Sequence, residues 1–126
     1  MKFLVVDDSP TMRRIVINAL RKIGYSEIVQ AEDGKDAWDK LSDEKIDFII
    51  TDWNMPNMNG LQFTQTVRNN ARFQTLPILM VTTRSGRGDV LQALQAKVNN
   101  YVTKPFTPQV LKDKIDQILQ SVQEKA

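Results

Sequence analysis

Short stretches that are apolar at consecutive positions recur along this chain, and they constrain its fold more than any other feature. Phe3–Val6, Ile46–Ile50 and Ile78–Val81 are three such stretches, Ile28–Ala31 is a less regular fourth, and Tyr101–Val102 adds a fifth. Strands that are apolar on both faces are typical of a parallel sheet covered by helices. The sequence therefore predicts a five-stranded parallel sheet at the centre of the molecule.

Helical patterns separate these stretches. Apolar residues from Met12 to Ile23 form one stripe at helical spacing, and Ser9 and Pro10 precede it as an N-cap and a first helical residue. Four further helices are expected around positions 37–41, 61–67, 90–94 and 110–122. This fivefold alternation predicts a doubly wound α/β fold. A length of 126 residues suits one domain.

Composition excludes several kinds of chemistry. The chain has no Cys and no His, which leaves carboxylates, amines, hydroxyls and the backbone as reactive groups. A net charge of +2 without clustered basic residues argues against a nucleic-acid partner. The segment Met1–Asp8 has a short apolar run that ends in two acids, which fits neither a signal peptide nor a membrane span. We therefore expect a cytoplasmic protein with no membrane contact.

Polar side chains follow four of the predicted strands. Asp7 and Asp8 follow the first strand, Asp52 the third, Thr82 the fourth and Lys104 the fifth. In a doubly wound sheet these strand ends meet where ligands bind. The sequence thus predicts one pocket that holds three carboxylates, a hydroxyl and an amine.

Each of these residues also has a simpler interpretation. Asp8 could be an acid at a helix N-terminus, Asp52 a turn residue ahead of Pro56, Thr82 an ordinary strand residue and Lys104 a surface lysine. Together, however, three carboxylates need a cation to offset their charge. Oxygen ligands without His or Cys favour a hard cation, and Mg²⁺ fits better than Ca²⁺, which usually needs a larger oxygen cage.

A carboxylate beside Mg²⁺ and an ammonium group can act as a nucleophile toward phosphorus. Asp52 would then form an acyl phosphate, while Lys104 and the Thr82 hydroxyl would stabilise the phosphoryl oxygens. Pro105 follows Lys104, and a cis bond at that position would fix the direction of the lysine side chain.

Other aromatic and basic residues are expected to be structural. Trp38 and Trp53 are interpreted as partly exposed packing residues, although Trp53 adjoins Asp52 and should sense metal entry. Tyr101 is expected to be half-buried against the last helix, or else to report the state of the pocket by taking two positions. Arg13 and Arg14 are expected to form a solvated helix face.

Four motifs in order give this chain a family resemblance over essentially its whole length. They are Asp7-Asp8, the segment 51–60 (Thr-Asp-Trp-Asn-Met-Pro-Asn-Met-Asn-Gly), Thr82, and Tyr101 through Lys104 to Phe106. The set resembles the receiver domains of bacterial response regulators, and most of all the stand-alone chemotaxis regulators among them. The resemblance implies one receiver domain over residues 1–126, with a flavodoxin-like (βα)5 fold and the strand order 2-1-3-4-5.

The resemblance also implies a mechanism. Asp52 would take a phosphoryl group from a histidine kinase of the CheA type. Mg²⁺ would be held by Asp7, Asp8, Asp52 and the main-chain carbonyl of Asn54. Such a protein is a signalling switch and not an enzyme, because it catalyses only its own phosphorylation and dephosphorylation.

The implied output is a change in partner binding. Thr82 would move toward the phosphoryl group, and Tyr101 would turn inward. The face formed by the fourth helix, fifth strand and fifth helix would then bind the flagellar motor switch, with FliM as the expected contact. A phosphatase could act on the phosphorylated form, and a monomer is expected.

Three positions depart from the family pattern. Lys97, within Ala96-Lys97-Val98, stands where Gly is usual, and a left-handed conformation there would cost about 1 kcal/mol relative to Gly. We expect a shifted end of the fourth helix. Thr83 replaces a smaller residue and is expected to narrow access to the phosphoryl group. Arg84 replaces a Glu common in chemotaxis members and, with Asn54, is expected to change the lifetime of the phosphorylated state.

Two other functions share part of this pattern. A phosphorelay shuttle that passes phosphate to a histidine phosphotransfer protein uses the same pocket. A Mg²⁺-dependent phosphohydrolase of the haloacid dehalogenase type would carry Asp-x-Asp after the first strand, whereas Asp7 and Asp8 are adjacent. A transcription factor is not expected, because no DNA-binding segment follows the fifth helix in this sequence.

Overall fold

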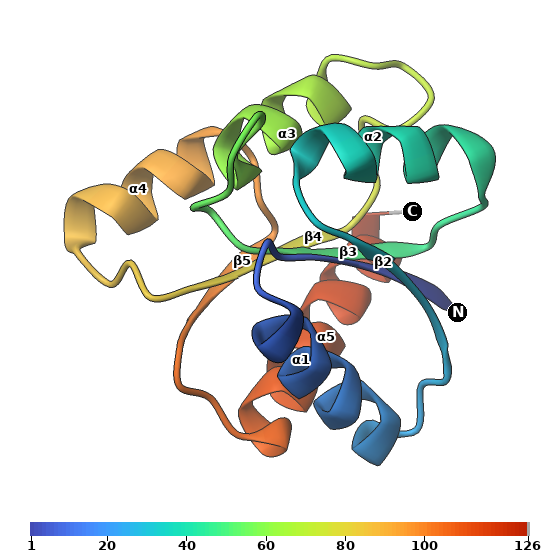
Figure 1. The fold of residues 1–126 in the computed structure, drawn as a ribbon, viewed down its shortest axis with the longest axis vertical. Helices are drawn as coiled ribbons and strands as arrows, with labels where there is room; N and C mark the ends of the chain where they lie inside the picture. The colour runs from blue at the N-terminus through green and yellow to red at the C-terminus, as the bar shows by residue number, and fades with distance from the viewer. Residues whose placement is uncertain (126) are drawn as a thin grey trace.

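The structure is a computed structural model that describes residues 1–125, with side chains to Val122. Strands and helices alternate along these residues (Figure 1). The strands are β1 Lys2–Val6, β2 Glu27–Ala31, β3 Phe48–Thr51, β4 Ile78–Thr82 and β5 Asn100–Thr103. The helices are α1 Pro10–Ile23, α2 Gly34–Asp43, α3 Gly60–Arg68, α4 Arg87–Gln95 and α5 Pro108–Lys125.

The strands form one parallel sheet in the order β2-β1-β3-β4-β5. Helices α2, α3 and α4 cover one face of the sheet, and α1 and α5 cover the other (Figure 1). The predicted doubly wound fold and its strand order are therefore confirmed. Strand order reverses between β1 and β3, so the carboxyl ends of these two strands lie at the position where such sheets bind ligands.

The two faces of the sheet bury separate apolar clusters because successive strand residues point to opposite sides. Leu4 and Val6 pack with α2, α3 and α4, whereas Phe3 and Val5 pack with α1 and α5. All of the residues of β3 and β4 are buried. Burial on both faces explains why these strands read as continuous apolar runs.

Local signals set the start of the first helix. The Ser9 hydroxyl accepts a hydrogen bond from the backbone N–H of Met12 at 3.2 Å, and Pro10 occupies the first turn. The predicted cap is confirmed. The helix ends at Gly24, whose φ of 119° suits a residue without a side chain.

Most strand ends differ from the prediction by one residue, and the start of β3 differs by two. Strand β3 begins at Phe48 and not at Ile46, because its pairing with β1 begins at Phe3 opposite Phe48. Ile46 is nevertheless buried, in the cluster beneath α2, α3 and α4. An apolar side chain ahead of a strand can thus extend the apparent run without joining the ladder. Within residues 1–125 no helix has the length and apolar character needed to cross a membrane.

Candidate functional site

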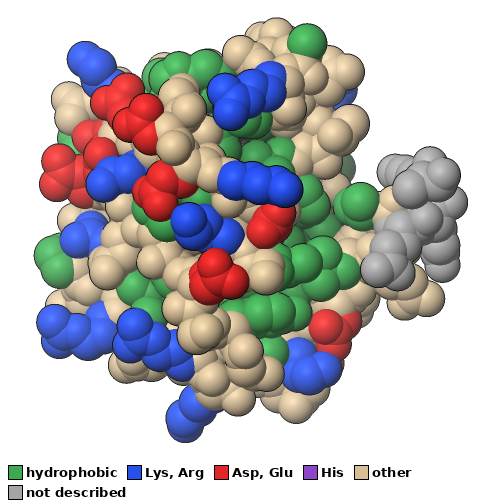
Figure 2. Space-filling model, turned by 90° about the vertical axis from the view of Figure 1, so that its right-hand side faces the viewer, with side chains coloured by type: hydrophobic (Ala, Val, Ile, Leu, Met, Phe, Trp, Pro, Cys, Tyr) green, Lys and Arg blue, Asp and Glu red, His purple; other side chains and the backbone are tan. Residues whose placement is uncertain are grey.

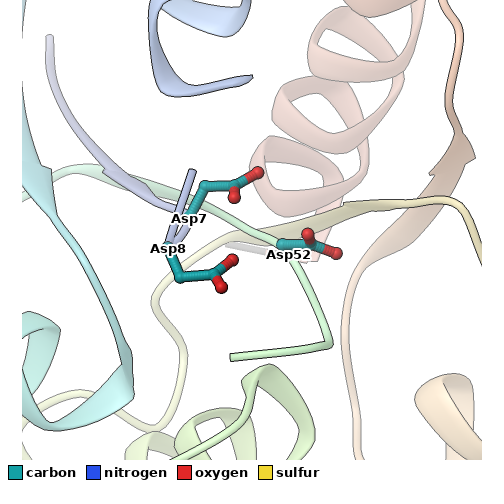
Figure 3. A group of neighbouring side chains, drawn as sticks. All are labelled: Asp7, Asp8 and Asp52. Atoms are coloured by element: carbon teal, nitrogen blue, oxygen red, sulfur yellow. The ribbon is translucent and has the colours of Figure 1, made fainter. Parts of the chain in front are cut away.

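Three carboxylates meet at the carboxyl ends of β1 and β3. These strands are neighbours, and Val6 lies opposite Thr51, so Asp7 and Asp52 leave the sheet side by side. One carboxylate oxygen from each of Asp7, Asp8 and Asp52 lies within 4.8 Å of the other two (Figure 3). The predicted convergence of these residues is present.

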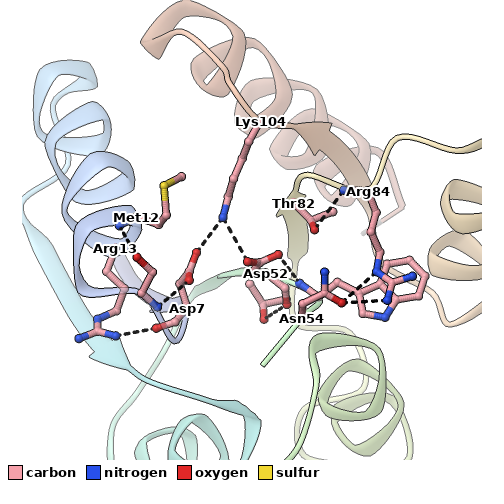
Figure 4. A network of polar contacts seen from close by, with 11 residues as sticks. Asp7, Met12, Arg13, Asp52, Asn54, Thr82, Arg84 and Lys104 are labelled. Carbon is pink, nitrogen blue, oxygen red and sulfur yellow. Dashed lines mark hydrogen bonds and ion pairs between the residues drawn. The ribbon is translucent and has the colours of Figure 1, made fainter. Parts of the chain in front are cut away.

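Lys104 reaches this cluster from the end of β5. Its ammonium nitrogen lies 2.8 Å from Asp7 Oδ2 and 3.2 Å from Asp52 Oδ2 (Figure 4). The lysine side chain is only 7% exposed, so it is not a surface lysine. The Lys104–Pro105 peptide bond is cis, as considered from the sequence.

Backbone groups fix the directions of the Asp7 and Asp52 side chains. Asp7 Oδ1 accepts a hydrogen bond from Ser9 N at 3.0 Å, and Asp52 Oδ1 accepts one from Trp53 N at 2.6 Å. The chain turns sharply after Asp52, and a Cβ at Gly60 would lie 1.9 Å from the Asp52 carbonyl oxygen. Glycine is therefore required where α3 returns to the end of β3.

The donor set suits a hard divalent cation. Three carboxylates face one ammonium group in the cluster, which leaves local negative charge. The ligand oxygens come from Asp side chains without His or Cys, a combination that favours Mg²⁺ or Ca²⁺ over transition metals. The acidic cluster could therefore bind a metal ion.

A cavity of about 500 Å³ opens beside the acids. Asp7, Asp8, Asp52 and Lys104 contribute its polar lining, and the remaining wall comes from α1, the β4–α4 loop and the β5–α5 loop, namely Ser9, Met12, Ile15, Thr83, Pro105 and Phe106. Thr83 lines the wall of this cavity.

Thr82 ends β4 and is fully buried. Its hydroxyl oxygen accepts a long hydrogen bond of 3.4 Å from Arg84 N. Figure 4 shows Thr82 at the end of β4, between Asp52 and Arg84.

Arg84 bridges the β4–α4 and β3–α3 loops. Its Nε and Nη2 donate to Asn54 Oδ1 at 3.0 and 2.9 Å, and its guanidinium carbon lies 4.5 Å from the centre of the Trp53 ring. A weaker contact of 3.5 Å joins it to Asp89. Two of the three residues predicted to affect the phosphorylated state, Asn54 and Arg84, are thus in direct contact.

Tyr101 points inward. Its hydroxyl donates a 2.6 Å hydrogen bond to the Arg84 carbonyl oxygen, and the residue is 9% exposed. Burial, with a smaller effect from the charge of Asp89, raises the pKa of Tyr101 to about 12. The expectation of a half-buried tyrosine against the last helix was wrong, because Tyr101 belongs to the cluster beneath α2, α3 and α4.

Two other expectations need correction. Trp53 is 4% exposed and belongs to the apolar cluster beneath α2, α3 and α4, with Arg84 over its ring. Trp38 is partly exposed as predicted. Arg13 is not simply a solvated residue: its guanidinium donates to the Asp7 carbonyl oxygen at 2.6 Å and to Gln30 at 3.2 Å. Arg14 is exposed as predicted.

Two features were not anticipated from the sequence. Asp33 caps α2 and also accepts a hydrogen bond from Asn57, which lies 24 residues further along the chain. Arg68 donates to the carbonyl oxygens of Lys97 and Leu76, among others, and burial lowers its pKa. The N-cap position of Asp33 was readable from the sequence, but neither long-range contact was.

Comparison with known proteins agrees with this geometry. Residues 3–116 match the family model described as the response regulator receiver domain. The chain is 54% identical to chemotaxis protein CheY1 of Helicobacter pylori, over 94% of this chain and 97% of that protein. It is 48% identical to chemotaxis protein CheY of Pseudomonas aeruginosa, over 97% of this chain and 98% of that protein.

A solved structure gives the same result. The crystallised chemotaxis protein CheY4 of Vibrio cholerae superposes with a TM-score of 0.85 at 34% identity, covering 93% of this chain and 97% of that chain. This chain therefore belongs to the response regulator receiver family, whose members are signalling switches. Within that family it is a CheY-like receiver of the chemotaxis type.

Proposed function

We propose that the chain acts as one receiver domain in which Asp52 accepts a phosphoryl group from the phosphohistidine of a CheA-like kinase. The observation that carries this proposal is the position of the Lys104 ammonium, which contacts both Asp7 and Asp52 inside the acidic cluster. A buried lysine between two carboxylates is poised to neutralise the oxygens of an incoming phosphoryl group.

The proposed reaction is an in-line transfer. An Asp52 carboxylate oxygen attacks phosphorus, the P–N bond to the donor imidazole breaks, and the imidazole leaves with its electron pair. Asp7, Asp8, Asp52 and the main-chain carbonyl of Asn54 would hold Mg²⁺. When bound, the ion neutralises charge on the phosphoryl oxygens.

The proposed response uses Thr82 and Tyr101. The Thr82 hydroxyl donates to a phosphoryl oxygen, and the accompanying movement of the β4–α4 loop favours the inward position of Tyr101. The hydrogen bond from Tyr101 to the Arg84 carbonyl supports this link, because it ties the tyrosine to the loop that follows Thr82. Phosphorylation would thus shift an existing equilibrium between two arrangements.

The proposed output surface is formed by α4, β5 and α5. Leu91, Leu94 and Val110 are large apolar residues there that are 53%, 45% and 41% exposed. Exposed apolar residues on one surface are typical of a protein interface. The relatives' names support a partner in chemotaxis, and a FliM-like motor switch protein is the partner that we propose for the monomeric protein.

The distribution of charge does not favour a nucleic-acid partner. On the face in Figure 2, basic and acidic side chains are interspersed across its middle and do not form one continuous basic patch.

The lifetime of the phosphorylated state would depend on Asn54, Thr83 and Arg84. Arg84 engages the Asn54 side-chain oxygen with two hydrogen bonds, so that oxygen is not free to orient an attacking water. Thr83 lines the cavity through which water and any phosphatase would approach. Slow loss of phosphate is therefore expected.

Phosphorylation can be tested with a small donor. Acetyl phosphate and Mg²⁺ should add one acid-labile, hydroxylamine-sensitive phosphate, measured by intact mass. Asp52→Asn should remain unmodified, and Asp47→Asn is a matched control because Asp47 lies at the opposite end of β3. Equal modification of the two variants would contradict the proposal.

The switch can be separated from a phosphorelay shuttle. A peptide from a FliM-like protein should bind the beryllofluoride-treated protein more tightly than the untreated protein. No difference in affinity, together with transfer of phosphate to a histidine phosphotransfer protein, would favour the shuttle.

A further inference from the structure

Two loops at the edge of the site are joined at two points. The Asp33 carboxylate, in the β2–α2 turn, accepts a 2.8 Å hydrogen bond from Asn57 Nδ2 in the β3–α3 loop. Next to this bond, Gly34 N donates to the Met58 carbonyl oxygen at 2.9 Å. A Cβ at Gly34 would lie 2.7 Å from Met58, so only glycine permits this approach.

Asp33 does more than cap a helix. Its Oδ1 accepts a hydrogen bond from Asp36 N at 2.8 Å, which completes the N-cap of α2. Its Oδ2 accepts the hydrogen bond from Asn57. Asp33 is 5% exposed as a residue, and the hydrogen bonds from Asp36 N, first, and from Asn57 lower the pKa of its carboxyl group. A buried anion therefore holds the other loop through its second oxygen.

The loop that Asp33 holds carries part of the site. Asn57 has a φ of 67°, a conformation that costs free energy for a residue with a side chain. The same loop begins at Asp52, includes Asn54, and closes where Gly60 N donates to the Trp53 carbonyl oxygen. The hydrogen bond to Asp33 thus stabilises a strained residue midway between two fixed ends.

We propose that Asp33 is a positioning residue for the metal and phosphoryl site, acting through Asn57 on the β3–α3 loop. This inference rests on the proposed function. Fixing the loop at Asn57 restricts the main chain at Asn54, whose carbonyl is the proposed metal ligand. Loss of the bond should weaken Mg²⁺ binding by about ten-fold, the lower end of the effect seen when partners behind metal ligands are removed.

Two variants remove the bond in different ways. Asn57→Gly keeps the left-handed backbone and deletes the donor. Asp33→Ser retains a hydroxyl that can cap α2, but it is too short to reach Asn57 as well. Lys97→Gly is the matched control, because it introduces glycine at another left-handed position, with a φ of 76°, in a distant loop.

Calorimetric titration of the full chain with MgCl₂ measures the effect on binding. Each single variant should bind Mg²⁺ about ten-fold more weakly, the double variant should bind no more weakly than either single one, and Lys97→Gly should bind as the unchanged protein does. Amide hydrogen exchange without Mg²⁺ should be faster over residues 53–58 in both single variants.

The outcomes separate the inference about Asp33 from the proposed function of the chain. An effect on stability alone, with Mg²⁺ affinity and loop exchange unchanged, would leave Asp33 as a helix cap and overturn the inference. Additive losses in the double variant would also overturn it. If the unchanged protein does not bind Mg²⁺, that result would contradict the proposed function and, with it, the inference about Asp33.

Discussion

Replacement of Lys104 by methionine probes the electrostatics of the site. The ammonium contacts Asp7 and Asp52, and the three side chains are 7%, 5% and 13% exposed, so solvent screens these pairs poorly. Methionine keeps much of the length of the side chain but removes the charge. The variant then holds three neighbouring carboxylates without their cation.

The expected cost follows from this burial. Removal of one member of a buried ion pair typically costs 3–5 kcal/mol, and we expect about 3 kcal/mol because Asp8 and part of Asp52 reach solvent. For a domain of this size, such a loss lowers the urea midpoint by roughly 1.5 M. Saturating Mg²⁺ should reduce the difference in stability between the unchanged protein and Lys104→Met, because Mg²⁺ binds the folded state and meets more negative charge in the variant.

Urea unfolding followed by tryptophan fluorescence, with EDTA or with MgCl₂, measures both effects. Lys112→Met is the control, because Lys112 pairs with Asp116 at an exposed position and its removal should change stability little. A Lys104→Met variant that is as stable as the Lys112→Met variant in EDTA would refute the reasoning. The same conclusion would follow if Mg²⁺ left the difference in stability between the unchanged protein and Lys104→Met unchanged.

The further predictions concern four single residues. Lys97→Gly should raise the free energy of unfolding by about 1 kcal/mol, because Lys97 has a φ of 76°; an unchanged urea midpoint would argue against strain there. Ultraviolet titration, with Tyr101→Phe as the reference, should show a phenol with a pKa of about 12. The stability that depends on neutral Tyr101 should be complete below about pH 10 and lost as the pH rises toward 12. Arg84→Ala should shorten the life of the acyl phosphate by freeing Asn54, and an equal or longer life, followed by mass spectrometry, would contradict this role. Because the pKa of Asp33 is lowered, its contribution to the free energy of unfolding should be present above about pH 4 and be lost as the pH falls further. The difference in stability between the unchanged protein and Asp33→Ser should therefore shrink in acid.

Most of the fold was predictable because its signals are local. Buried runs such as Phe3–Val6 and Ile78–Val81 and the helical stripe after Ser9 each specify their own element. The alternation of these elements then limits the topology to a doubly wound sheet. The boundary error at Ile46 arose because apolar character reports burial and not membership of the ladder.

The acidic cluster was predictable for a related reason. Asp7, Asp8, Asp52 and Lys104 directly follow strands, and parallel strands bring such positions to one edge of the sheet. No side-chain contact had to be known in advance. The cluster therefore follows from the topology alone.

Contacts between loops were not predictable in this way. Arg84 lies over the Trp53 ring from another loop, and the Tyr101 hydroxyl donates to a carbonyl in that same loop. The bond between Asp33 and Asn57 likewise joins two turns whose approach is set by the folded backbone. Spacing along the sequence does not predict contacts of this kind between loops.

Chemical mapping of the phosphorylated residue tests the central claim most directly. Borohydride reduces an acyl phosphate on aspartate to homoserine, and peptide mass spectrometry then locates the altered residue. After treatment with acetyl phosphate and Mg²⁺, we predict homoserine at position 52 alone. Homoserine at Asp7 or Asp8, or at no aspartate, would contradict the assignment of Asp52 as the phosphoryl acceptor.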